Sequence, residues 1–318
     1  MRNARTWSML GPSGVLGLAV CELAEKDDNL MVITSDLCSF SGLERFRNAY
    51  PERMFNVGIA EQNMIGLAGG MAKEGMNVFT TTYATFASTR ALDQIKVNVG
   101  YMNLPIKIIG LTAGFAVGIL GATHMSIEDI AIMRSIPNMV VISPADSTET
   151  MKAVLAAGET KTPVYIRMNG VQRSPIVYKE DYDFTIGKAI KLREGNDIVF
   201  MVHGTMVYQV LRVAEQLELE GISCEVIDVH TIKPIDSEMI LNCCDKKAIV
   251  TVEEHSVIGG LGTAVAEVLA PVKNTPPQLI LGVADAYPHA ASYEALLKEN
   301  GLTAEGIYTS VKKFIKED

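Results

Sequence analysis

Short apolar runs separated by helical segments recur along the chain and constrain its fold more than any other feature. In the first half, such runs occupy residues 31–35, 78–82, 106–111, 140–143 and 164–166. Segments with helical periodicity alternate with them, at residues 15–25, 86–99, 126–134 and 146–157, and a further helix begins at Glu61. Strands that are apolar throughout and alternate with helices are typical of a mostly parallel sheet covered on both faces. Residues 1–170 are therefore predicted to form a doubly wound α/β domain.

The alternation then fades and starts again, which predicts a second domain. Residues 171–195 are largely polar, and we assign them to a linker. Beyond it, strand-like runs occupy residues 198–202, 224–229 and 248–252, with helical segments at 206–219 and 262–269. A chain of 318 residues is long enough for two hydrophobic cores. Residues 196–318 are predicted to form a smaller α/β domain.

Composition excludes several classes of protein. A net charge of −9 without a basic stripe opposes binding to nucleic acid. The most lipid-like run, residues 108–122, is shorter than the roughly 20 residues that span a bilayer, and the N-terminal residues lack the apolar core of a signal peptide. Five cysteines without CxxC spacing favour a reducing compartment. We expect a cytoplasmic protein that binds neither nucleic acid nor membranes.

Candidate site residues follow the predicted strands of the first domain. In a doubly wound sheet, ligands bind at the carboxyl ends of the strands. The side chains expected there are those of Asp36, Tyr83, Phe86, His124 and Arg167, and Glu61 at the start of its helix points to the same rim. Each also has an ordinary structural alternative. A glutamate can balance a helix dipole, an aspartate can cap a turn, aromatic and histidine side chains can be core, and an arginine can form a rim salt bridge.

Several long stretches resemble the transketolase family. The stretches GIAEQNMIGLAGGMA, TTYATFASTRALDQIK, GATHMSIEDIAIMRSIPNMVVISPAD and PVYIRMNG occur in the order and spacing of its pyrimidine-binding domain. Beyond the linker, DIVFMVHGTMV, EVIDVHTIKPID and VEEHSVIGGLG resemble its C-terminal domain. The resemblance covers nearly the whole chain and implies thiamine diphosphate as the cofactor.

The resemblance also implies roles in cofactor binding. The glutamate that matches Glu61 bonds to the ring nitrogen of the cofactor's aminopyrimidine, and by sharing a proton it prepares the thiazolium carbon to lose its own. Phe86 matches an aromatic residue that stacks on the aminopyrimidine, and Tyr83 matches a second aromatic residue of that pocket. Asp36 is expected to approach the cofactor. Arg90 and Asp93 are predicted to form an internal charge pair instead of binding substrate.

For the substrate, the resemblance implies two contacts and shows two departures. His124 matches a substrate-contacting histidine that can shuttle a proton, and Arg167 matches an arginine that binds the phosphate group of the sugar. Thr112 stands where typical transketolases carry another substrate-binding histidine, and Leu120 replaces an aspartate that reads a sugar hydroxyl. We therefore expect a substrate that differs from the usual donor sugars.

No segment of the chain matches the diphosphate-binding domain of full-length transketolases, in which a Gly-Asp-Gly motif and a later Asn hold magnesium and diphosphate. The turn at residues 259–262 lacks an acidic residue and is weak evidence for phosphate binding. We therefore expect no metal ligands in this chain, which is predicted to be the C-terminal subunit of a split transketolase. A separate N-terminal subunit would hold Mg²⁺, in a two-fold symmetric α2β2 heterotetramer.

The predicted reaction is two-carbon ketol transfer between sugar phosphates. The alternatives are a 2-oxoacid dehydrogenase β-type subunit, a deoxyxylulose-phosphate-synthase-type subunit and a non-catalytic regulatory subunit. An acyl transfer to lipoamide would identify the first, and consumption of pyruvate would identify the second. The third predicts that changing Glu61 has no effect on activity.

Overall fold

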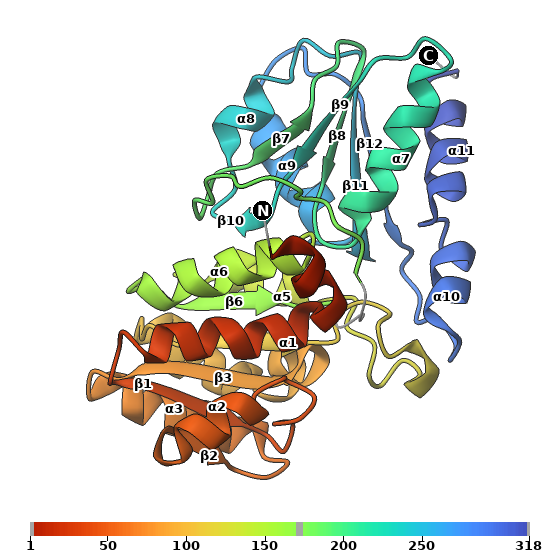
Figure 1. Cartoon of the computed structure of the whole chain (residues 1–318). Coiled ribbons are helices and arrows are strands. Elements are labelled where there is room, and N and C mark those ends of the chain that lie inside the picture. The colour runs from red at the N-terminus through yellow and green to blue at the C-terminus, as the bar shows by residue number, and fades with distance from the viewer. Residues whose placement is uncertain (1–2, 170–173, 317–318) are drawn as a thin grey trace.

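Two mostly parallel sheets build the protein, one in each domain, as Figure 1 shows for a computed structural model that describes residues 3–169 and 174–316. The first sheet has the order β10-β5-β6-β4-β3-β1-β2. Its strands from the first half of the chain are β1 (Leu30–Thr34), β2 (Met54–Asn56), β3 (Asn77–Tyr83), β4 (Lys107–Leu111), β5 (Val140–Ile142) and β6 (Val164–Arg167). These strands pair in parallel, which confirms the predicted doubly wound fold.

Helices cover both faces of this sheet and bury a separate hydrophobic cluster on each. On one face, α1 (Ala4–Ala24) and α6 (Ser147–Glu159) lie side by side (Figure 1). The other face is covered by α3 (Glu61–Lys73), α5 (Asp129–Ser135) and the segment that comprises η2 (Phe86–Arg90), α4 (Leu92–Gln94) and η3 (Ile95–Tyr101). Shorter elements are α2 (Glu44–Ala49), η1 (Pro51–Arg53) and η4 (Gly118–Leu120).

Helix α1 begins well before the predicted residue 15. It bends at Gly11, which has a non-helical φ of 72° and is followed by Pro12. By length and composition alone, α1 could span a membrane. In this fold, however, Val15, Leu16 and Ala19 are fully buried in the core beneath α1. The helix therefore packs as a core helix of the first domain.

The second sheet has the order β12-β11-β8-β9-β7. Its strands are β7 (Ile190–Arg193), β8 (Ile198–Val202), β9 (Cys224–Asp228), β11 (Ala248–Ser256) and β12 (Gln278–Val283). The helices of this domain are α7 (Met206–Glu218), α8 (Ser237–Leu241), α9 (Leu261–Leu269), α10 (Tyr293–Glu299) and α11 (Ala304–Phe314). β7 lies inside the segment assigned to the linker, because an antiparallel edge strand alternates apolar and polar residues and contains no continuous apolar run.

The two domains are joined by more than the connecting segment. Strand β10 (Thr231–Lys233) follows β9 of the second domain but pairs antiparallel with β5 at the edge of the first sheet. The connecting segment itself docks on α6, since the backbone N–H groups of Val177 and Tyr178 donate to the Asp146 carboxylate at 2.8 and 3.0 Å. A shared sheet and hydrogen bonds from the connecting segment therefore hold the two domains together.

A buried carboxyl pair also crosses this interface. Glu149 on α6 interacts with Asp228 at the end of β9, while Tyr182 donates to Glu149 and Tyr178 donates to Asp228. Burial raises the pKa of Asp228 to about 7, and burial together with the charge of Asp228 raises the pKa of Glu149 well above its ordinary value. The pair is therefore most stable when it retains a proton.

The stability of the protein is expected to fall as the pH rises through this pair's range. The folded-state pKa of Asp228 lies above its unfolded value. Its contribution to the free energy of unfolding is therefore complete below about pH 4 and is lost as the pH rises through about 7. The slope is at most ~1.4 kcal/mol per pH unit for one proton. The double variant Glu149→Gln/Asp228→Asn, which leaves no ionisable group in the pair, is expected to flatten this dependence. Denaturation midpoints measured between about pH 5 and 8 test it, with Glu159→Gln on the exposed end of α6 as the control. A wild-type midpoint that does not change over this range contradicts the prediction.

Candidate active site

Glu61 lies at the first position of α3 with only 2% of its surface exposed. A tight turn brings it there, because Gly58 has a φ of 72° and donates its N–H to the side chain of Asn56 at 3.0 Å. The amide of Asn56 in turn donates to the carboxylate of Asp36 at 3.0 Å. Asp36 is exposed, and its predicted approach to the cofactor stays a prediction, while its observed contact supports the turn that leads to Glu61.

Phe86 lies on η2, a π-helical turn that follows β3. The hydroxyl groups of Ser88 and Thr89 donate to the carbonyl oxygens of Ala84 and Thr85, four residues earlier. Such bonds compete with the regular helical ladder and bend helices, and π-turns are frequent at functional sites. The continuous helix predicted over residues 86–99 is therefore interrupted.

Three aromatic side chains meet beside this turn. The ring of His124 lies 5.3 Å from the ring of Phe86 and 6.2 Å from that of Tyr83, with edge-to-face geometry in both cases. Tyr83 and Phe86 are 5.9 Å apart. The hydroxyl of Thr123 lies 2.9 Å from Nδ1 of His124 and fixes the ring orientation. The structure thus brings Tyr83, Phe86 and His124 together from β3, η2 and a loop about 40 residues away.

Arg90 joins this cluster to Glu61. Its Nη1 donates to both carboxylate oxygens of Glu61 at 3.0 Å, and its guanidinium carbon lies 4.0 Å from the centre of the Phe86 ring. The predicted charge pair of Arg90 with Asp93 is therefore wrong, because the guanidinium reaches across to α3 instead. The spacing of Phe86 and Arg90, four residues apart on a helical segment, was the sequence signal that could have placed them on one face.

The loop after β4 is strained and carries exposed apolar side chains. Thr112 has a φ of 53°, which is a genuine outlier for a β-branched residue, and it lines a cavity of about 400 Å³ together with Ser39 and Phe40. Farther along, Ile119 and Leu120 are 73% and 48% exposed. Strain of this kind is often stored at functional sites. The two positions that depart from typical transketolases, Thr112 and Leu120, therefore lie on the loop that leads to His124.

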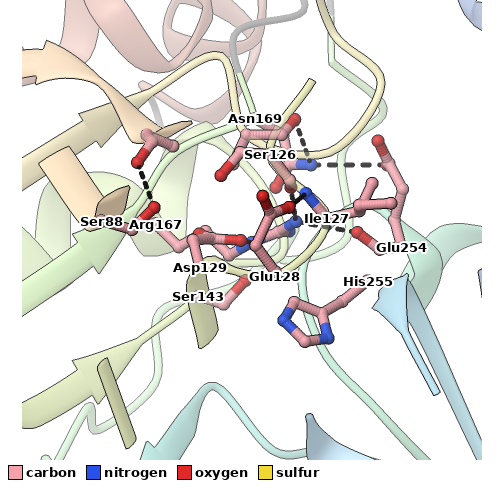
Figure 2. Close-up of polar contacts among 12 residues, drawn as sticks. Ser88, Ser126, Ile127, Glu128, Asp129, Ser143, Arg167, Asn169, Glu254 and His255 are labelled. Carbon is pink, nitrogen blue, oxygen red and sulfur yellow. Dashed lines mark hydrogen bonds and ion pairs between the residues drawn. The ribbon is translucent and has the colours of Figure 1, made fainter. Parts of the chain in front are cut away.

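The structure places Arg167 outside this cluster, and its predicted contact with a substrate phosphate stays a prediction. Figure 2 shows it in a buried network with Asp129, and neither side chain has any exposed surface. Its Nε donates to Asp129 at 3.0 Å, and its Nη2 donates to the carbonyl oxygens of Ser126 and Glu254. Burial alone would lower the pKa of Arg167, but Asp129 and Glu254 hold that pKa above its ordinary value. Among the described residues its Nη1 has no hydrogen-bond partner, and Arg167 lines a cavity together with Pro144 and Asn169.

Glu254 of the second domain holds the base of the His124 loop, a role that the sequence did not predict. Its Oε1 accepts from the backbone N–H of Phe115 at 2.6 Å, and its Oε2 accepts from the hydroxyl groups of Thr205 and Tyr293, each at 2.7 Å. Burial raises the pKa of Glu254. Figure 2 shows this carboxylate beside Arg167 and Asn169. The second domain thus fixes the loop that carries the candidate substrate-binding histidine.

The glycine-rich turn at residues 259–262 has a structural partner of its own. Helix α9 begins at Leu261, and the Glu253 carboxylate accepts from the backbone N–H groups of Leu261 and Gly262 at 2.7 and 2.9 Å. A Cβ at Gly260 would lie 1.9 Å from this carboxylate. The anion site at this helix N-terminus is therefore filled by Glu253. Within residues 3–169 and 174–316, no group of three or more His, Cys, Asp or Glu side chains could hold a metal ion.

Comparison with known proteins identifies the family. Residues 12–170 match the transketolase pyrimidine-binding domain, and residues 187–307 match the transketolase C-terminal domain. The chain belongs to the transketolase family. This result confirms the predicted resemblance, and it places Glu61, Phe86 and His124 in the domain that is named for pyrimidine binding.

Two relatives that are named as subunits are similar in length to this transketolase-family chain. A 6-deoxy-6-sulfo-D-fructose transketolase subunit of Clostridium sp. is 42% identical over 290 residues, covering 90% of this chain and 88% of the relative. A subunit of the apulose-4-phosphate transketolase of Phocaeicola vulgatus is 36% identical over 298 residues, which cover 93% of this chain and 95% of the relative. A solved split-gene transketolase, described as an inactive beta4 tetramer, has a TM-score of 0.86 and 39% identity and covers 95% of this chain and 97% of its own. The predicted similarity to split transketolase subunits is confirmed.

Proposed function

We propose that this chain is the pyrimidine-binding subunit of a thiamine-diphosphate-dependent transferase that moves a two-carbon ketol group between sugar phosphates. The observation that carries the proposal is the convergence of Glu61, Phe86 and His124. Arg90 joins the buried Glu61 carboxylate to the Phe86 ring, and the ring centre of the half-buried His124 lies 5.3 Å from that of Phe86. The matched pyrimidine-binding domain supports this assignment.

The residues present fit the aminopyrimidine half of the cofactor. The Arg90 guanidinium is itself a flat group with N–H donors, and it already lies between the Glu61 carboxylate and the Phe86 ring. A planar ring that can donate to a carboxylate and stack on an aromatic face suits the same pair of side chains. When bound, thiamine diphosphate supplies a carbon nucleophile that accepts the ketol group.

Each side chain of the cluster then has a defined task. Glu61 holds a proton against the ring nitrogen of the cofactor, and its burial at the start of α3 keeps water away from that contact. Phe86 orients the ring, and Tyr83 closes the pocket on one side. His124 faces both aromatic rings and can donate a proton to a substrate oxygen or accept one from it. Asp36 is proposed to approach the cofactor from the end of β1.

The diphosphate group and its Mg²⁺ are proposed to bind to a separate N-terminal subunit in an α2β2 heterotetramer in the cytoplasm. The relatives named as subunits support a partner chain, as does the description of the solved relative as an inactive beta4 tetramer. Exposed apolar residues beside the site, among them Ile59 at 77%, offer a surface for the partner.

The substrate is proposed to be a sugar phosphate or a related sugar that carries another anionic group. Relatives named for 6-deoxy-6-sulfo-D-fructose and for apulose 4-phosphate support this breadth. Leu120, exposed on the loop before His124, places an apolar wall where a hydroxyl of the usual donor would need a polar partner. A standard pentose phosphate assay alone is therefore a poor test.

Calorimetric titration of thiamine diphosphate with Mg²⁺ is the decisive experiment, performed first on this chain and then on its mixture with the partner subunit. Tight binding in the mixture alone supports the proposal and leads to a screen of ketose phosphates. Equal binding by the single chain refutes the separate diphosphate site. Assays with lipoamide and with pyruvate then distinguish ketol transfer from 2-oxoacid dehydrogenase and deoxyxylulose-phosphate synthase chemistry.

A further inference from the structure

We infer that Arg90 is a built-in placeholder, whose guanidinium occupies the aminopyrimidine position in the unliganded chain and must leave before the cofactor can bind. The inference rests on the proposed function. It assigns to Arg90 a regulatory role in cofactor binding.

Arg90 occupies both groups on which an aminopyrimidine ring depends. Its Nη1 lies 3.0 Å from each carboxylate oxygen of Glu61, so the acceptor edge of Glu61 is engaged. Its guanidinium plane lies over Phe86 at 4.0 Å, so one face of that ring is covered. A ligand that stacks on this face of Phe86 while bonding to Glu61 has to take the place of the guanidinium.

The Arg90 side chain can rotate away while Glu61 and Phe86 stay in place. The Arg90 side chain is 44% exposed, whereas Glu61 has only 2% exposure and lies at the first position of α3. Within residues 3–169 and 174–316, the hydrogen bonds of Arg90 side-chain atoms are the two to Glu61. Rotation of this long side chain therefore exposes a preformed carboxylate and an aromatic ring without moving any helix or strand.

Competition from Arg90 lowers the apparent affinity of the chain for the cofactor. When only a fraction of the molecules has the site open, the apparent dissociation constant rises by the inverse of that fraction. If about one molecule in ten is open, cofactor binding is weakened about tenfold. Contacts to the diphosphate from a second subunit would offset this competition, so Arg90 would make cofactor binding depend on assembly. Without such contacts, the Arg90 guanidinium stays between Glu61 and Phe86.

The test uses a small probe on the full chain alone, so that neither the partner subunit nor turnover is needed. Binding of 4-amino-2-methylpyrimidine is measured by ligand-detected NMR for the wild type and for Arg90→Ala. Arg90→Ala is expected to bind the probe at least about tenfold more tightly, and millimolar guanidinium ion is expected to displace it. Adding Glu61→Gln to Arg90→Ala is expected to abolish the gain, because the carboxylate acceptor is lost.

Arg212→Ala, the same change on the exposed surface of α7, serves as the matched control and is expected to bind the probe as the wild type does. Arg90→Lys replaces this test if Arg90→Ala does not fold. Because lysine keeps the charge but lacks the flat face, its gain in probe affinity is expected to be intermediate. Equal or weaker probe binding by both Arg90 variants overturns the inference. In that case, cofactor binding by the wild-type assembly shows that the proposed function survives. If that assembly binds neither cofactor nor probe, the proposed function fails and this inference fails with it.

Discussion

Glu61→Gln is expected to lower the cofactor-dependent turnover of the assembled enzyme by roughly 10² to 10⁴-fold, the usual range for loss of a positioned acid or base. Glutamine has nearly the same shape and fills the same buried position at the start of α3. Its amide cannot share a proton with the ring nitrogen of the cofactor. The decrease is therefore expected in kcat at saturating cofactor, measured with the ketose substrate found by screening.

The control for this prediction is Glu74→Gln, which changes an exposed glutamate just after the same helix. Both variants are expected to remain folded, because the Glu61 ion pair involves a partly exposed arginine and such pairs contribute about 1 kcal/mol or less. Circular dichroism and the denaturation midpoint check this point. Unchanged turnover in folded Glu61→Gln would show that this chain is a non-catalytic subunit.

The strands of the first domain were largely predictable because burial on both faces leaves a simple signal. β4 and β6 are fully buried and are apolar except at Lys107 and Arg167, and the predicted strands at 106–111 and 164–166 overlap them. β7 and β10 were not predicted, since both are short antiparallel strands whose pairing is set by tertiary contacts. β10 in particular leaves its own domain to pair with β5, and no local pattern encodes such a partner.

The candidate site was predictable where the residues follow strands and was not predictable where they form pairs. Tyr83 is the last residue of β3, Phe86 follows that strand, and His124 lies on the loop after β4, so all three were expected at one rim. The partner of Arg90 could not be read in the same way, because Glu61 is 29 residues away and the choice between Glu61 and Asp93 depends on the π-turn. For Arg167, the structure adds contacts that the family pattern did not suggest, because its guanidinium pairs with Asp129 and donates to the carbonyl oxygen of Glu254 on β11.

Arg167 and Asp129 therefore give the second large prediction, which concerns stability. Arg167→Met would leave the Asp129 carboxylate buried beside Tyr165 without its cation, and Tyr165 alone donates one hydrogen bond to it at 2.7 Å. Breaking a buried ion pair on one side typically costs about 3–5 kcal/mol, since the remaining charge stays desolvated. We expect a decrease of this size in the free energy of unfolding, measured by urea denaturation.

The double variant Asp129→Asn/Arg167→Met provides the critical comparison, because it removes both charges while the amide oxygen of the introduced asparagine can still accept from Tyr165. Replacing a buried pair by neutral groups of similar volume is often nearly neutral, so most of the lost stability is expected to return. Arg193→Met, which breaks the more exposed pair with Glu218, is the control and is expected to cost about 1 kcal/mol or less. If Arg167 also binds the substrate phosphate, Arg167→Met will raise KM for phosphorylated sugars as well, and the double variant will not repair that defect. Recovery of stability in the double variant, measured together with KM, therefore separates the contribution of the buried ion pair from that of a substrate contact.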